Sequence, residues 1–345
     1  MVGVINFEFG GVRRSGVVDC IFVDPIQIDH VDVADVEQLV AWNAVLRDGY
    51  NTGREAAWWR SAEATVSQFQ SPKPGRFSVA LLASRGDRPV GAAGAHVDPG
   101  EVAEVEVSVL PDCRRGHVGL VLADAVRIAL AGRADRVQAE TYSDAGIAFA
   151  QHLGLEVGIP ESRQLLDLPV SAERLARIDR QPSGVEIHAW VGRCPEELVK
   201  DWASLTRQMA TDVPVGDLTR STQATDVAAV RQHEERMQAQ GYLLVSCLAR
   251  VGGQSVGYTE MLLSSHAPEI VNQEDTLVDR AYRGRGVGRA LKLANLRQLQ
   301  QLPEARHSRW VQTYTATENS PMLALNRAVG FREADIMTAL EGPLR

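Results

Sequence analysis

Hydrophobic and polar positions along this chain form two series that predict the same elements in the same order. Each series opens with a short strand, continues into a helix whose apolar residues recur every three or four positions, and adds a second, more polar helical segment. These segments are residues 24–28, 33–46 and 54–69 in the first series and residues 184–190, 194–210 and 224–240 in the second. The shared order favours an internal repeat over two unrelated folds.

The later parts of the two series also match. Two strands follow the helices, a longer strand runs into a glycine-containing turn, and a strand, a short helix and a glycine between apolar residues close each series. The closing glycines are Gly154 and Gly330, and pairing Gly116 with Gly286 aligns the two turns. The sequence therefore predicts that both halves of the chain adopt one α+β plan.

This repeat also predicts where the chain divides. We expect an N-terminal domain over residues 22–169 and a C-terminal domain over residues 185–345. The linker is expected over residues 170–184, where Pro182-Ser183-Gly184 interrupts any helix or strand.

Composition and charge exclude several classes of protein. The chain has 345 residues, of which 45% are hydrophobic and 23% charged, which is typical of a globular protein. The net charge of −8 argues against general nucleic-acid binding, which needs a basic face. No apolar run approaches the roughly 18–20 residues that span a bilayer, so no membrane partner is expected. The N-terminus does not resemble a signal peptide, and we expect a cytoplasmic protein.

The four cysteines carry little functional information. Cys20, Cys113, Cys194 and Cys247 form no CxxC pair, and no histidine lies near them at the spacing of a metal site, so we expect no metal. Arg114 and Arg115 would lower the pKa of the Cys113 thiol. Reduced, unreactive thiols are nevertheless the expected state in a cytoplasm.

One short segment has the features of a phosphate site. Residues 279–292, DRAYRGRGVGRALK, follow an apolar strand and lead into a helical pattern. The first turn of a helix has N–H groups without internal partners, and the helix dipole adds positive charge there. Three glycines let a ligand approach the backbone, and neighbouring arginines can pair with phosphate oxygens. The alternative is a solvated surface turn, but the RxxGxG spacing at a strand-to-helix junction favours a pyrophosphate site.

At this point the residues resemble a known family. The run Arg283-Gly284-Arg285-Gly286-Val287-Gly288 resembles the acyl-CoA pyrophosphate loop of the GCN5-related N-acetyltransferases, the GNAT superfamily. Residues 313–333 resemble its companion motif, in which Asn319 precedes a short helix and Gly330 is followed by phenylalanine. The resemblance covers both halves, and the match is stronger in the second half. This arrangement resembles the tandem GNAT proteins of actinobacteria.

The resemblance implies a fold and a co-substrate. Each domain would be a mixed, mostly antiparallel sheet flanked by helices and splayed at its middle strands, with acetyl-CoA in the wedge. The backbone of Leu277 and Val278 would pair with the pantetheine arm, and Asn319 would contact the same region. The pyrophosphate would be held by Arg283, Gly284, Arg285, Gly286, Val287, Gly288 and Arg289.

The first copy departs from the family pattern. Aligned on Gly116, the leading Arg or Gln of the loop becomes Cys113, and the second small residue becomes Val118. Gly119 restores the small residue only if the loop slides by one position. Ser143 occupies the place of the asparagine. We expect a degenerate half that supports the fold or the substrate cleft; the alternative is a half that binds CoA without turning it over.

Acetyl transfer to an amine needs a base and stabilisation of the developing oxyanion. Glu260, Glu274 and Asp275 are the candidate bases, although each alone could be an ordinary strand residue. Strand alternation predicts that Glu274 and Asp275 point to opposite faces. The Val278 N–H is the candidate oxyanion donor. The family often has tyrosine as the acid where this chain has Asn326, which leaves protonation of the thiolate to water or another residue.

The sequence therefore predicts an N-acetyltransferase that uses acetyl-CoA to acetylate a primary amine of a small molecule, such as an antibiotic or a metabolite, in its second half. A non-catalytic acyl-CoA sensor or scaffold and a protein-lysine acetyltransferase are the alternatives. The pair Trp58-Trp59 is expected to pack rather than to bind substrate, and residues 233–236 are expected on a solvated helix face. No residue identifies the amine or the oligomeric state.

Overall fold

The computed structural model describes residues 25–179, 182–220 and 225–345. Cys20, the first residues of the expected N-terminal domain (22–24) and parts of the expected linker and of the helix from residue 224 lie outside these ranges.

The observed elements confirm the repeated order. The first half contains β1 (Ile26–His30), α1 (Val36–Asn51), α2 (Ala62–Gln70), β2 (Phe77–Arg85), β3 (Arg88–Val97), β4 (Ala103–Val109), α3 (Val118–Leu130), β5 (Arg136–Thr141), α4 (Asp144–His152) and β6 (Glu156–Asp167). The second half contains β7 (Val185–Val191), α6 (Val199–Asp212), α7 (Val227–Ala239), β8 (Tyr242–Val251), β9 (Gln254–Ser264), β10 (Ile270–Val278), α8 (Val287–Gln301), β11 (Trp310–Ala316), α9 (Ser320–Val329) and β12 (Arg332–Pro343). A short helix, α5 (Ala172–Ile178), lies between the halves.

The strands form one 12-stranded sheet in the order β1-β2-β3-β4-β5-β12-β6-β11-β10-β9-β8-β7. Two pairs are parallel, β4 with β5 and β10 with β11, and the other pairs are antiparallel. Each parallel pair is short, two residues long in the first half and three in the second. Beyond these pairs the strands separate, so each half contains the expected splayed, mostly antiparallel sheet.

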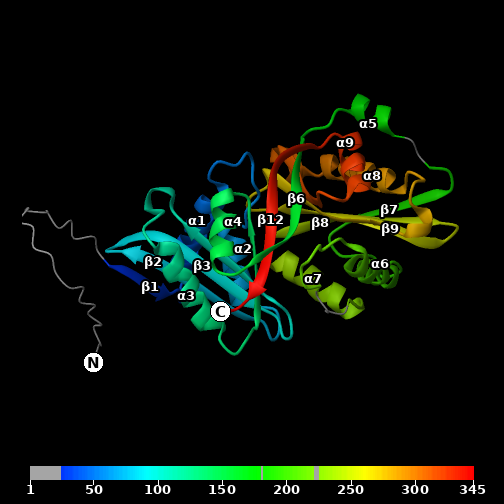
Figure 1. Ribbon diagram of the computed structural model, residues 1–345. Helices are drawn as coiled ribbons and strands as arrows, with labels where there is room; N and C mark the ends of the chain where they lie inside the picture. The colour runs from blue at the N-terminus through cyan, green and yellow to red at the C-terminus, as the bar shows by residue number, and fades with distance from the viewer. Residues whose placement is uncertain (1–24, 180–181, 221–224) are drawn as a thin grey trace, which may run out of the picture.

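The last strand of each half lies beside the other half. β12 pairs with β5 of the first half, β6 pairs with β11 of the second, and β6 and β12 pair with each other. These two long strands cross the middle of the molecule in Figure 1. Backbone hydrogen bonds therefore join the two halves into one sheet. Residues 170–184 separate the two sequence repeats, but they do not separate two sheets.

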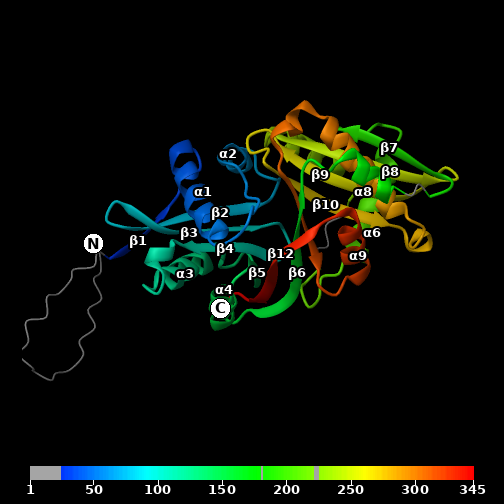
Figure 2. The same cartoon turned by 90° about the horizontal axis from the view of Figure 1, so that it is seen from above.

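Helices cover both faces of the sheet. In Figure 2, α1 and α2 lie on one side of the first-half strands, and α3 and α4 lie on the other. In the second half, α8 and α9 lie on one side and α6 and α7 on the other (Figure 1). The helix α8 begins after the glycine loop and buries apolar residues such as Leu291 and Leu296 against the sheet, which fixes the position of the loop.

The segment between α1 and α2 differs from the expected helix over residues 54–69. The helix begins at Ala62, with Ser61 as its N-cap, and the residues before it dock against the second half. The Arg54 guanidinium donates hydrogen bonds to both carboxylate oxygens of Asp335 at 3.0 Å. Trp58 packs against Tyr242 with a ring-centroid separation of 6.2 Å, so the expectation that it packs is confirmed.

Asp335 is the anionic centre of this junction. Arg163, which is fully buried, donates hydrogen bonds of 2.9 and 2.8 Å to Asp335 Oδ2. Burial acts to raise the pKa of Asp335, but the hydrogen bonds from Arg54 and Arg163 outweigh it, and the pKa is lowered. One carboxylate therefore balances two buried guanidinium groups from the first half.

We expect Asp335→Asn to lower the free energy of unfolding by about 3 kcal/mol, because it leaves Arg54 and Arg163 buried without an anionic partner. Urea unfolding followed by tryptophan fluorescence would measure the loss. The control is Glu55→Gln, which removes an ion pair of Arg332 at an exposed site and should change stability little. Equal effects of the two substitutions would contradict the assigned role of Asp335.

Candidate active site

The wedge in the second half lies where β10 leaves β11. The two strands pair over Ile270–Asn272 and Trp310–Gln312 and then separate. The Asp279 N–H donates to Val256 O at 2.8 Å, toward β9. Because N–H directions alternate along a strand, the Val278 N–H points the other way, into the wedge. The Val278 N–H and the unpaired edge of β10 thus face the wedge, which is where the resemblance places acetyl-CoA.

The glycine loop follows Val278 directly. Gly284 and Gly286 have φ values of +77° and +84°, in the left-handed region that favours glycine, and Gly286 is the N-cap of α8. Residues 283–286 are exposed, so a ligand can reach the backbone. Within the described residues, Arg289 Nε is buried and has no hydrogen-bond partner, which fits a role in binding a phosphate.

Arg283 has a different role from the other loop arginines. It donates to Val278 O at 2.9 Å and forms an ion pair with Asp212 at 2.9 Å. Asp212 also pairs with Arg280 at 2.8 Å. Arg283 therefore ties the loop to the end of β10 and of α6, whereas Arg285 is exposed and free of ion pairs within the described residues.

Two asparagines lie on the other side of the wedge. Asn319 is the N-cap of α9, and its Oδ1 accepts a hydrogen bond from the Met322 N–H at 3.3 Å, which leaves its amide NH₂ available for the pantetheine region. Asn326 is fully buried and donates to Gln164 at 2.8 Å. Asn326 thus holds α9 against β6 and does not offer a proton to a leaving thiolate.

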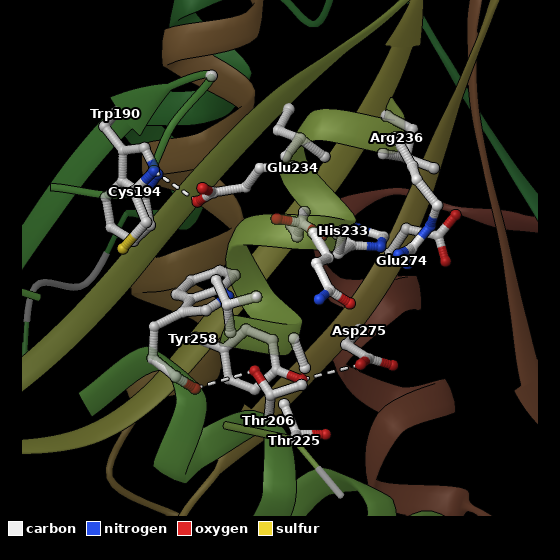
Figure 3. Close-up of a pocket in the computed structure, with 18 of the residues that line it drawn as sticks. Trp190, Cys194, Thr206, Thr225, His233, Glu234, Arg236, Tyr258, Glu274 and Asp275 are labelled. Carbon is white, nitrogen blue, oxygen red and sulfur yellow. Dashed lines mark hydrogen bonds and ion pairs between the residues drawn. The ribbon is translucent and has the colours of Figure 1, made fainter. Parts of the chain in front are cut away.

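A cavity of about 350 Å³ lies between the sheet and the helices α6 and α7 (Figure 3). Glu260, Glu274 and Asp275 all line it, together with Trp190 and Tyr258. The carboxyl groups come from β9 and from β10, the strand that leads to the glycine loop. The cavity therefore brings the three predicted bases together in one site.

A β-bulge in β10 explains this arrangement. Gln273 pairs with Met261 and Thr276 pairs with Thr259, so Glu274 and Asp275 lie opposite Glu260. Bulges redirect side chains and are common beside active sites. The expectation that strand alternation separates Glu274 from Asp275 was wrong, because the extra residue interrupts the alternation.

Glu260 is held deep in the cavity. Its side chain is 14% exposed, and its Oε2 accepts a hydrogen bond of 3.0 Å from Ser246. Burial raises the pKa of Glu260 to about 8 against the effect of Ser246, and the charges of Glu274 and Asp275 add to the rise. At neutral pH Glu260 is therefore mainly a neutral carboxylic acid that can donate a hydrogen bond.

Glu274 is more accessible. Glu274 is solvent-exposed at the cavity, but the protein atoms packed around it partly desolvate its carboxylate; this desolvation and then the charge of Asp275 raise its pKa to about 7. Substrate in the cavity would exclude water and strengthen this effect. Burial also raises the pKa of Asp275, which accepts a 2.8 Å hydrogen bond from Tyr258. Figure 3 shows this bond as a dashed line.

The helix α7 contributes cavity-lining side chains that the sequence analysis did not place there. His233, Glu234 and Arg236 line the cavity, so the expectation of a solvated helix face was wrong. Burial lowers the pKa of His233, and Arg236 lowers it further, so its imidazole is neutral at neutral pH. A signal was available: Glu234 lies between Val230 and Met237 at helical spacing, which places it on the buried face.

The loop of the first half is closer to the second than its sequence alignment suggested. Arg114 Nε donates to Val109 O at 3.1 Å, as Arg283 does to Val278 O. His117, with φ +61°, is the N-cap of α3 and occupies the place of Gly286. The alignment of Gly116 with Gly286 was therefore wrong by one residue: Arg114 leads the loop, and Gly119 rather than Val118 follows as the small residue. Two departures from the family pattern are left: His117 in place of the loop glycine, and Ser143, the N-cap of α4, in place of the asparagine.

The substrate side of the first half differs more strongly. Gly94 lies opposite Glu106 in a stretch of β3 and β4 without a register shift, so this half has no bulge there. Trp42 fills the adjacent space: its indole N–H donates to Ala93 O at 2.8 Å, and a Cβ on Gly94 would lie 2.7 Å from its ring. The first half thus has the loop, but it has neither the bulge nor an open space where the second half gathers Glu260, Glu274 and Asp275.

The cysteines, a metal site and a membrane-spanning helix are the other features that the sequence analysis considered. Cys113, Cys194 and Cys247 are free thiols. Burial and a hydrogen bond to Asp112 raise the pKa of Cys113, so the idea that Arg114 and Arg115 activate it was wrong. Within the described residues, no group of three or more His, Cys, Asp or Glu side chains could hold a metal. The helices of the same residues include none long and apolar enough to cross a bilayer.

These observations define an acyl-CoA-dependent transferase fold: a sheet splayed once in each half, a glycine loop at a helix N-terminus, and a carboxyl-lined cavity on the strand that leads to the loop. The sequence model of the acetyltransferase (GNAT) family matches residues 42–155 and 207–331, which together make up more than half of the chain. The chain belongs to this family, and its relatives support an N-acetyltransferase that uses acetyl-CoA.

Named relatives cover most of the chain. The mycothiol acetyltransferase of Clavibacter sepedonicus is 33% identical over 264 residues, which span 74% of this chain and 78% of that protein. The mycothiol acetyltransferase of Thermobifida fusca is 27% identical over 284 residues, 76% of this chain and 82% of that protein. Among solved structures, a tandem GNAT protein from the clavulanic acid biosynthesis pathway has a TM-score of 0.78 at 24% identity and covers 93% of this chain and 99% of its own. This last similarity concerns the fold.

Proposed function

We propose that this protein transfers the acetyl group of acetyl-CoA to the primary amine of a small molecule, and that the second half of the chain carries the activity. The observation that supports this most is the bulge in β10, which gathers Glu260, Glu274 and Asp275 in one cavity beside the wedge and the glycine loop. The equivalent strand pair of the first half, β3 and β4, has no such bulge, and Trp42 fills the adjacent space, which supports a structural role for that half.

The residues that bind acetyl-CoA would be those of the wedge and loop. The backbone of Leu277 and Val278 would pair with the pantetheine arm, and the NH₂ group of Asn319 would face it. The N–H groups of residues 284–288 would hold the pyrophosphate, with charge from Arg285 and Arg289. Arg283 would act indirectly by holding the loop.

Glu274 is the best candidate base, because its carboxylate faces the cavity and its pKa of about 7 lies near the working pH. The ammonium of the substrate loses its proton to Glu274, directly or through water, and the nitrogen bonds to the acetyl carbon. The Val278 N–H stabilises the charge that develops on the carbonyl oxygen. The C–S bond then breaks, and water protonates the thiolate, whose pKa resembles that of cysteine. Glu260 and Asp275 would tune Glu274 and bind the amine.

A mycothiol-related amine is the first substrate to test, because relatives at 27–33% identity are named mycothiol acetyltransferase. We also propose a cytoplasmic location, where acetyl-CoA is available. An acyl-CoA sensor or scaffold and a protein-lysine acetyltransferase remain the alternative functions.

The experiment is a screen for release of the CoA thiol from acetyl-CoA with the purified full-length chain. Small primary amines, including a mycothiol-related amine, are compared with lysine-containing peptides. Steady thiol release with a small amine supports the proposal. Release with peptides alone would indicate a protein acetyltransferase, and CoA binding without release would indicate a sensor.

A further inference from the structure

Positive charge faces the candidate cavity from two elements. Arg236, on α7, and Lys73, from the loop after α2 in the first half, both line it. Figure 3 shows Arg236 on the same side of the cavity as His233 and Glu274, with Trp190 on the opposite side. The cavity thus has carboxyl groups on the sheet and cations on the helix and the loop that cover it.

The surroundings of Arg236 leave its charge poorly balanced. Its side chain is partly buried, and within the described residues it forms no hydrogen bond or ion pair. The anion that acts on its charge is Asp98, which already binds Lys73 and Arg76, each at 2.7 Å. Burial lowers the pKa of Arg236, the charge of Arg76 lowers it further, and Asp98 offsets part of this effect. An anion in the cavity would relieve the unfavourable placement of this guanidinium.

We propose that the amine acetylated by this protein also carries a carboxylate, so that the substrate is an amino acid or a close derivative, and that Arg236 binds the carboxylate. The proposal rests on the proposed acetyltransferase function. A guanidinium matches a carboxylate with two parallel hydrogen bonds. The ammonium group of such a zwitterion would point toward Glu260 and Glu274, and Lys73 would add positive charge near the carboxylate.

The size and walls of the cavity agree with this class of substrate. Its volume of about 350 Å³ lies at the lower end of the range of small-molecule sites, which suits an amino acid or a dipeptide. Trp190, Leu244 and Leu262 provide an apolar wall for the rest of the molecule. A polyamine would gain from the carboxyl groups but would be repelled by Arg236 and Lys73, so the two cations select against it.

The test compares matched pairs of acceptors, each an α-amino acid and its carboxamide, in the thiol-release assay. The wild-type protein should prefer the acid by about tenfold or more in kcat/KM, and Arg236→Gln should remove most of this preference through KM, with kcat changed by less than about threefold. Turnover of the carboxamides should change little. The control is Lys200→Gln, an exposed cation on α6 outside the cavity, which should keep the preference.

Three results would overturn the proposal while leaving acetyl transfer intact. They are equal use of acids and carboxamides by the wild type, an unchanged preference in Arg236→Gln, and better turnover of a mycothiol-related amine without a carboxylate than of every amino acid. If no amine supports thiol release, the proposed function fails. Calorimetry then decides the binding claim, because N-acetyl amino acids should bind more tightly than their amides to the wild type and equally to Arg236→Gln.

Discussion

Replacing Gly286 by valine is expected to lower kcat/KM for acetyl transfer by at least about 100-fold, which corresponds to about 2.7 kcal/mol of transition-state stabilisation. Gly286 has φ +84°, a conformation that a β-branched residue adopts only under strain, and it caps the helix whose N–H groups are proposed to bind the pyrophosphate. A side chain there both distorts the loop and blocks the approach of the phosphates. Steady-state thiol release gives the loss of activity, and calorimetry with CoA gives the loss of affinity.

The first half offers a matched control. His117 occupies the equivalent position at φ +61°, so His117→Val places the same side chain at the start of α3. We expect acetyl transfer to be nearly unchanged in this variant. Calorimetry also counts sites: CoA binding that persists in Gly286→Val and disappears when His117→Val is added to it would assign a silent second site to the first half. Equal losses of activity in the two variants would contradict the assignment of catalysis to the second half.

Much of the fold was predictable because its signals are local. Periodicity located both helices and strands in each half, and the strand-turn-helix junction at residues 279–292 located the glycine loop. Gly284 and Gly286 adopt left-handed conformations, which glycine reaches without strain, and this explains why the loop contains glycine at these positions. The parts of the site that depend on one continuous segment were therefore visible in the sequence.

The remaining parts depend on pairing between distant segments. Nothing in β6 or β12 indicates that each would lie beside the opposite half, because both strands would bury their faces equally well in their own sheet. The bulge in β10 is a property of its register with β9, so alternation misplaced Asp275 relative to Glu274. The loop of the first half was misaligned because a glycine was matched to a glycine, whereas the backbone places His117 there.

Glu274→Gln is expected to lower kcat by about 10²- to 10⁴-fold, the range for removal of a general base. The active form of Glu274 is the carboxylate, and its pKa is raised to about 7, so the wild-type kcat/KM should fall as the pH drops below about 7 and level off above it. The variant should lose this acidic limb, because its amide does not titrate. A pH series of kcat/KM, with circular dichroism as the check on folding, measures both effects.

Glu260→Gln is the matched comparison from the same cavity. Glu260 has a pKa of about 8 and is mainly protonated at neutral pH, so a glutamine keeps its neutral state and its contact with Ser246. We expect a smaller loss of kcat, with the acidic limb retained near the same pH, since a neutral Glu260 carries no charge that opposes ionisation of Glu274. If Glu260→Gln abolishes the limb and Glu274→Gln retains it, the two carboxyl groups exchange roles, and the deeper one on β9 is the base.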